Sequence, residues 1–298
     1  MDGLEALQKR IKTTQDMRAI VSTMKSLSAV SVVQYDAALK SLSVYGETID
    51  AGVSVLMRHG VVSIPKPKTL PPAQRKVLAV IIGSDTGLVG RLNRDVVAEA
   101  GRVLKKEGYM PENVRYLAVG RQIIGLLERA EKTISGAYPV SNSVKAISTT
   151  AIAVLVKINE LLQTEGLSNV YLFYQRKRGS NIQPFSSLMI PMGDEWLKNL
   201  RGRKWKSRRF PVYTMNSGKL FSSLMRERLM MTLSIALAEA LTAEHHMRLT
   251  TMQAAEKNID DNLEKMNQVY QQMRQENITT ELLDVVNGAE AMRKKKTA

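Results

Sequence analysis

The sequence predicts an α/β domain with a mostly parallel sheet, inserted between two long terminal helices that pair as an antiparallel coiled coil. Residues 219–287 contain neither glycine nor proline, and a second uninterrupted stretch opens the chain at residues 4–45. Between them, short apolar runs alternate with amphipathic segments, which is typical of a parallel sheet covered by helices. The expected division is an N-terminal shaft helix over 1–58, a body over 59–216 and a C-terminal shaft helix over 217–298.

The first shaft helix has a heptad repeat, the pattern that winds two helices around each other with a left-handed supercoil. One position of the repeat is filled by Leu7, Thr14, Val21, Ser28, Tyr35, Leu42, Ile49 and Leu56. The other position is expected at Met17, Met24, Ser31, Ala38 and Tyr45. The small side chains in the middle of this seam would let a partner helix approach closely.

The C-terminal helix has a matching seam and an apolar end. Its seam is formed by Met252, Ile259, Met266 and Met273, with Leu249, Leu263 and Tyr270 between them. Seventy helical residues span about 105 Å, so the shorter N-terminal helix cannot cover all of it. Beyond the seam lies an apolar stripe, formed by Ile278, Leu282, Val285, Val286, Ala289 and Met292. Such a stripe is usually a packed core strip, but here we expect it to be exposed and to fit into another protein.

The body follows a proline-rich linker at residues 61–75. Strands are expected at residues 76–82, 115–119 and 168–174, with an edge strand at 182–190, and helices at residues 91–107, 121–131 and 144–165. This order predicts a Rossmann-like sheet.

A glycine-rich turn, GSDTGLVG at residues 83–90, stands between the first strand and the first helix of the body. Phosphates bind at helix N-termini in such places. However, the glycine spacing is neither that of a dinucleotide fingerprint nor that of a Walker A motif, and no acid for a ribose hydroxyl follows Val119. We expect a tight turn capped by Asp85. A nucleotide-binding α/β protein with helical arms remains the first alternative.

No catalytic, cofactor-binding or metal site is expected. The chain has no cysteine, which excludes a thiol nucleophile and a cysteine metal site. His245 and His246 are adjacent on a helix, so their side chains point in different directions and do not form an i, i+4 metal pair.

The net charge of +15 is concentrated in the body. Residues 59–216 hold 25 basic and 11 acidic side chains, whereas the two shaft helices are nearly balanced. A dense basic run consists of Arg201, Arg203, Lys204, Lys206, Arg208 and Arg209. Such a run indicates an anionic partner, such as lipid headgroups, an acidic protein or nucleic acid. The alternative is a solvated basic loop without a partner. Because only Trp205 interrupts it, base stacking has little support, and a basic helical scaffold that binds nucleic acid is the second alternative.

No segment approaches the roughly 18 continuous apolar residues of a membrane span. The N-terminus lacks the apolar core of a secretory signal. Together with the absence of cysteine, these features favour the bacterial cytoplasm.

Three groups of residues resemble the γ subunit family of F-type ATP synthase. The most extensive is C-terminal: Glu244, His245, Arg248, Met252, Ala255 and Asn258, then Arg274, Gln275, Ile278, Thr279, Glu281, Leu282, Asp284, Val285, Val286, Gly288 and Ala289. The second comprises Arg10, Ile11, Ile20, Met24 and Lys25, and the third is the turn at 83–93. The sequence departs from the family at Asp16, Met17, Val89 and Arg91, and at Ser31, Val33 and Gln34, where basic residues are usual.

The resemblance implies a central-stalk rotor subunit for ATP synthesis and ion transport. It would couple rotation of an ion-driven membrane ring to conformational changes in the catalytic β subunits, and would itself be non-catalytic. Its implied partners are the α and β subunits, the ε subunit and the c-subunit ring, with one copy per complex and no nucleic acid. The location would be peripheral, on the cytoplasmic side of a bacterial inner membrane. Coupling contacts to β are implied at Met24, Lys25, Arg274 and Gln275, and an apolar bearing at the stripe that ends at Met292.

Overall fold

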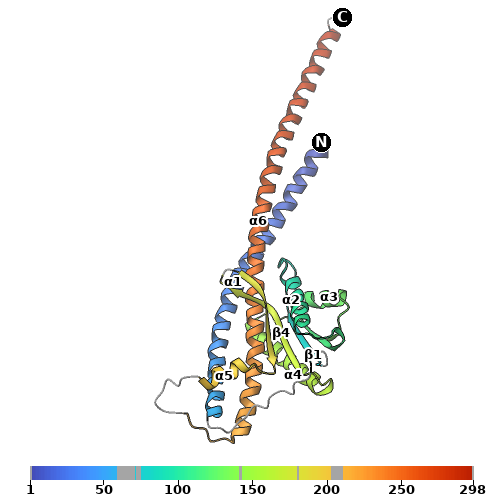
Figure 1. Cartoon of the computed structure of the whole chain (residues 1–298). Helices are drawn as coiled ribbons and strands as arrows, with labels where there is room; N and C mark the ends of the chain where they lie inside the picture. Colours follow the sequence, from blue (N-terminus) through green and yellow to red (C-terminus); the bar gives the residue numbers. More distant parts are fainter. Residues whose placement is uncertain are drawn as a thin grey trace. The chain divides into compact units, whose positions relative to one another are not determined.

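The computed structural model describes residues 2–58, 71, 75–140, 143–179, 181–202 and 211–296. The chain forms two compact units, one made of residues 1–27 and 249–298 and the other of residues 28–248. Two helices belong to both units: α1, Asp2–Arg58, and α6, Ser217–Lys296 (Figure 1). The two uninterrupted stretches of the sequence therefore do form single long helices.

The first unit is an antiparallel pair formed by the start of α1 and the last part of α6 (Figure 1). The seam of α6 is as predicted, since Met252 is buried and the six other seam residues are half-buried. On α1, Leu7, Thr14 and Val21 are half-buried as expected.

The second seam position of α1 is only partly as predicted: Met24, Ser31 and Ala38 are half-buried, but the buried side chains lie one residue later in the repeat. Met17 is 56% exposed, whereas Ile11 is buried. The same offset continues in the second unit, where Tyr45 is exposed and Val32 and Val53 are buried. A repeat of seven can be divided as three and four or as four and three, and this chain uses the second division. The prediction of Met17 and Tyr45 as seam residues is therefore wrong.

The second unit is built on a five-stranded sheet in the order β3-β2-β1-β4-β5. Its strands are β1 Val77–Ile82, β2 Val114–Val119, β3 Ile134–Tyr138, β4 Asn169–Arg178 and β5 Asn181–Ile190. The pairs β1·β2, β1·β4 and β2·β3 are parallel, and β5 is an antiparallel edge strand. This confirms the mostly parallel sheet and the edge strand at 182–190.

Helices cover both faces of the sheet, because successive side chains of a strand point to opposite faces. Val77, Ala79 and Ile81 pack with α2, Leu92–Lys106, and α3, Arg121–Arg129. Leu78, Val80 and Ile82 pack with α4, Val144–Thr164, and with residues 233–241 of α6. The α6 segment that crosses this face is rich in alanine, which allows close approach to the sheet.

Three short elements were not predicted: β3, the 3-10 helix Pro111–Asn113 and α5, Asp194–Gly202. Strand β3 is only partly buried and contains Ser135 and Gly136, so it lacks the apolar run that reveals a strand. Helix α5 has nine residues with only three large apolar side chains, Trp196, Leu197 and Leu200, which is a weak helical pattern. The predicted linker at 61–75 lies almost wholly outside the described residues.

Candidate functional site

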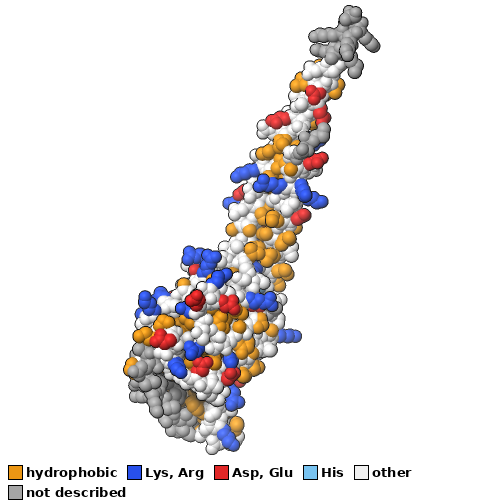
Figure 2. Space-filling model, turned by 90° about the vertical axis from the view of Figure 1, so that its right-hand side faces the viewer, with side chains coloured by type: hydrophobic (Ala, Val, Ile, Leu, Met, Phe, Trp, Pro, Cys, Tyr) orange, Lys and Arg blue, Asp and Glu red, His pale blue; other side chains and the backbone are white. Residues whose placement is uncertain are grey.

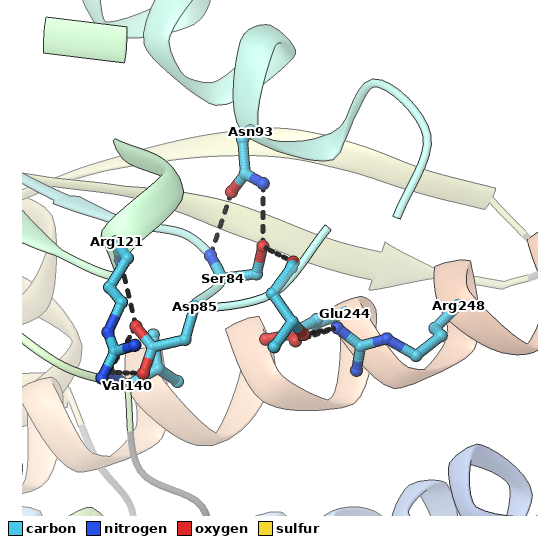
Figure 3. A network of polar contacts seen from close by, with 8 residues as sticks. Ser84, Asp85, Asn93, Arg121, Val140, Glu244 and Arg248 are labelled. Carbon is cyan, nitrogen blue, oxygen red and sulfur yellow. Dashed lines mark hydrogen bonds and ion pairs between the residues drawn. The ribbon is translucent and has the colours of Figure 1, made fainter. Parts of the chain in front are cut away.

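The glycine turn is closed by its own side chains. Asn93, in the first turn of α2, folds back so that its Oδ1 accepts from the Ser84 backbone N–H at 3.0 Å and its Nδ2 donates to Ser84 Oγ at 2.8 Å (Figure 3). A Cβ at Gly83 would lie 2.3 Å from Asn93 Oδ1, so only glycine fits there. The turn is therefore shaped by internal packing.

Asp85 does cap a helix, but not the helix that follows its own turn. Its carboxylate accepts from the backbone N–H of Arg121 at 3.0 Å, which is the first residue of α3, and from that of Val140 at 3.2 Å. The N-cap of α2 is Arg91, whose side chain makes no capping bond. The expectation that Asp85 caps the turn between β1 and α2 is therefore wrong. The backbone at Gly120, just before α3, lies close to Ser84. Asp85 therefore reaches the start of α3 and not the start of α2.

This arrangement gives the nucleotide-binding alternative no support. Nucleotides bind at the carboxyl ends of parallel strands, where helix N-termini offer free N–H groups to phosphate. Here the Ser84 and Arg121 amides are already bonded to Asn93 and Asp85. A phosphate at α3 would also meet the Asp85 carboxylate.

A buried arginine fastens α6 to this turn. Arg248 Nη2 donates to Thr86 Oγ1 at 2.7 Å and to Glu244 Oε1 at 2.6 Å (Figure 3). Arg248 is 7% exposed and Glu244 5% exposed, so the pair is almost fully shielded from water. Next to it, the ring of His245 stacks on Tyr35 of α1, with 5.2 Å between the ring centroids. One guanidinium thus joins the turn to α6 within the second unit.

Burial sets the protonation of this cluster. It raises the pKa of the Glu244 carboxyl, although the Arg248 guanidinium opposes the shift. Burial, and then the charge of Arg248, lower the pKa of His245 to about 4. His245 is therefore neutral at physiological pH. Among the described residues, no group of three histidine or acidic side chains could hold a metal ion.

The implied coupling residues lie in the first unit, at two separate places. Met24 is half-buried, and Lys25 forms an ion pair with Glu256 of α6. Arg274 and Gln275 are both exposed. Because eighteen helical positions separate Glu256 from Arg274, the two places are about 27 Å apart along α6.

Sequence reasoning missed two acids on α6. Asp260 accepts from Arg18 Nε at 2.5 Å, and Glu256 pairs with Lys25. Both basic residues occupy the shifted seam position of α1, and the two acids are four residues apart, on one face of α6. The recurrence of oppositely charged residues beside the two seams was the signal that could have identified these pairs.

The apolar stripe at the end of α6 has no covering partner among the described residues. Leu282 is 61% and Val285 70% exposed, and Ile278, Val286 and Ala289 are exposed as well. The helix continues to Lys296, but the side chain of Met292 lies outside the described part. In Figure 2, hydrophobic side chains are visible on the surface of this helical unit.

The basic run is mostly beyond the described residues. Arg201 is exposed near the end of α5. Arg203, Lys204, Lys206, Arg208 and Arg209 lie in the segment 203–210, outside the described residues.

Comparison with known proteins places the chain in a family. A family model described as ATP synthase matches residues 3–292. The ATP synthase gamma chain of Geobacter metallireducens is 25% identical over 296 residues, covering 98% of this chain and 100% of that one. The gamma chain of Granulibacter bethesdensis is 26% identical over 299 residues, with the same coverage.

Solved structures share the fold. A chain of the rotor of Euglena gracilis mitochondrial ATP synthase matches with a TM-score of 0.63 and 14% identity, covering 93% of this chain and 99% of that one. A chain from the central stalk and c-ring of the Tetrahymena thermophila enzyme gives a TM-score of 0.54 and 20% identity, covering 79% and 99%. Since the family model spans nearly the whole sequence, the chain belongs to the ATP synthase family, and the two relatives that it matches along its length are gamma chains.

Proposed function

We propose that this chain transmits torque in a bacterial F-type ATP synthase, turning with an ion-driven c-subunit ring and changing the catalytic β subunits in sequence. The observation that supports this most is the apolar stripe from Ile278 to Val286, exposed on an unbroken helix. Large apolar patches exposed on a protein mark sites of interaction with other proteins. A sleeve formed by the α and β subunits would cover this stripe and act as a bearing.

The chain acts on the β subunits without chemistry of its own. An asymmetric shaft presents a different face to each of several identical sites, and differential contact is what biases their affinities. Arg274 and Gln275 are exposed and can hydrogen-bond a partner through a guanidinium and an amide. Met24 and Lys25 would form a second contact, with Lys25 using the donors that its bond to Glu256 leaves or exchanging that bond.

The proposed location is the cytoplasmic face of the bacterial inner membrane, where the chain is held through its partners. None of the described helices is both long and apolar enough to cross a membrane. The basic run that begins at Arg201 would face anionic headgroups or the acidic surface of a neighbouring subunit. The two shaft helices, over 1–58 and 217–298, would contact the α and β subunits of the head. The body, over 59–216, would lie on the membrane side.

Co-purification tests this assignment. A tagged chain expressed in its native host should co-purify with α, β, ε and c subunits, which are identified by mass. Each complex should contain one copy of the chain. Recovery of the chain alone, or with nucleic acid that is released by salt, would instead favour the basic scaffold. Tight nucleotide binding by the purified chain would favour the nucleotide-binding alternative.

A further inference from the structure

A cavity of about 530 Å³ lies in the second unit, between the end of α2, the loop that follows it, the start of β2 and the end of α3. It borders the first residues of β2, whereas the glycine turn follows the last residue of the parallel strand β1. The cavity and the turn are therefore at opposite ends of the strands. Most of its lining is apolar, formed by Val97, Leu104, Met110, Pro111, Val114 and Leu127. Its volume falls within the range of about 300–1,000 Å³ that is usual for small-molecule sites.

An exposed glycine of α2 forms part of the cavity wall. Gly101 lines it, and a Cβ added there would meet no atom within 4 Å. Glycine destabilises a helix interior relative to alanine, and no neighbouring atom requires it at this position. This is unlike Gly83, where a Cβ would collide at 2.3 Å. The consequence of glycine at 101 is space in the cavity wall.

The charged groups that line the cavity are both positive. Lys105 and Lys132 both line it, and no acidic residue does. Neither lysine forms an ion pair with a described carboxylate, whereas Arg102, on the same helix, pairs with Glu99 at 2.6 Å. The buried ring of Tyr116 adds a phenol to the lining. An apolar interior with two cations is complementary to a molecule that has an apolar body and an anionic end.

We propose that this cavity binds a free, medium-length acyl carboxylate. Its apolar chain would lie between α2 and α3, against Leu104 and Leu127, and its carboxylate would be held by Lys105 and Lys132. Lysine ammonium groups form charge-assisted hydrogen bonds to carboxylates, and contact with the apolar lining would remove part of the ligand's chain from water. This site is separate from the torque function and does not depend on it.

Titration calorimetry on the purified full chain tests the proposal, with decanoate as the probe below its micellar concentration. Gly101→Leu should fill the cavity and weaken binding at least tenfold, while the helix remains intact because leucine is a better helix former. Gly125→Leu is the matched control: Gly125 is also a helical glycine with open space at its Cβ, but it does not line the cavity. This control should bind decanoate like the unmodified chain.

Ligands with the same apolar chain but different head groups distinguish the proposed site from nonspecific hydrophobic binding. Lys105→Gln combined with Lys132→Gln should weaken decanoate binding about tenfold, and decyltrimethylammonium should not bind measurably. Equal binding of decanol and decanoate, or equal decanoate affinity in the Gly101→Leu and Gly125→Leu variants, would overturn the proposal. A third outcome would also contradict the proposal: the chain binds anionic phospholipid vesicles equally well with and without Gly101→Leu, and it does not bind free decanoate. That result would indicate that the basic surface binds a membrane.

Discussion

Lys25 of α1 and Glu256 of α6 form an ion pair across the coiled coil, with Nζ 2.5 Å from Oε2. One heptad towards the N-terminus, Arg18 pairs in the same way with Asp260. Two consecutive heptads of α1 thus carry a charge pair beside the apolar contacts. Lys25 is therefore already bonded within the chain, and a contact with a β subunit would either displace Glu256 or use the remaining N–H donors of the ammonium group.

These pairs make the coiled coil sensitive to acid. The hydrogen bonds from Lys25 and Arg18 lower the pKa of Glu256 and Asp260 below the ordinary values of 4.5 and 3.8. A carboxylate with a lowered folded-state pKa stabilises the fold above its unfolded pKa, and this contribution is lost as pH falls through the folded pKa. Glu256→Gln with Asp260→Asn should therefore lower Tm more at pH 7 than at pH 3. An equal Tm difference at both pH values would show that the effect of the pairs is not electrostatic.

Arg248 should be the most sensitive polar residue of the second unit. Arg248→Met would leave the Glu244 carboxylate buried without its partner, which costs about 3–5 kcal/mol at pH 7. The loss should be smaller at pH 5, because the raised pKa of Glu244 favours its neutral form in the fold. Urea unfolding measures both values.

The contribution of the Arg248 contact to the turn can be measured separately. Thr86→Val removes only the acceptor and should cost about 1 kcal/mol, whereas Thr86→Ser keeps the hydroxyl and serves as the control. Equal stability of the Val and Ser variants would mean that the bond between Arg248 and Thr86 does not hold α6 to the turn.

A charge in the apolar stripe should interfere with assembly or torque and not with folding. Leu282→Asp places a carboxylate in the proposed bearing, while Thr280→Asp places the same charge on a nearby exposed polar position. We expect the first variant to reduce the recovery or ATP-driven rotation of the complex, and the second to have little effect, because a buried unpaired charge is costly. Far-ultraviolet circular dichroism should show the same helix content for both. Full activity of Leu282→Asp would rule out the bearing.

Coupling can be separated from assembly with a double variant. Arg274→Ala with Gln275→Ala should reduce ion-driven ATP synthesis more than uncoupled ATP hydrolysis, both measured on the same membranes. Each contact alone should be modest, since partly exposed pairs contribute little. An equal loss in both activities would indicate damaged assembly, and no loss in either would remove these residues from the coupling path.

Much of the fold follows from local patterns. The strand at 77–82 and the long helix that begins at Ser217 were predictable because apolar runs and the absence of glycine and proline act within one segment. The partner of Asp85 was not predictable, because Arg121 and Val140 reach it only through the packing of separate loops. The seam offset at Met17 was missed because Leu7 and Thr14 face the partner helix whether the heptad is divided as three and four or as four and three. The exposure of the stripe that begins at Ile278 was predictable because the C-terminal helix is longer than its partner helix, which can be read from the sequence alone.

Direct observation of rotation tests the central proposal. The chain contains no cysteine, so Glu128→Cys, at an exposed position of α3, provides a single labelling site. A fluorescent rod attached there, with the α and β subunits of the complex fixed to a surface, reports movement of the chain during ATP hydrolysis. The proposal predicts continuous rotation in one direction that stops when ATP is removed. A rod that stays fixed while the same complexes hydrolyse ATP at the normal rate would contradict it.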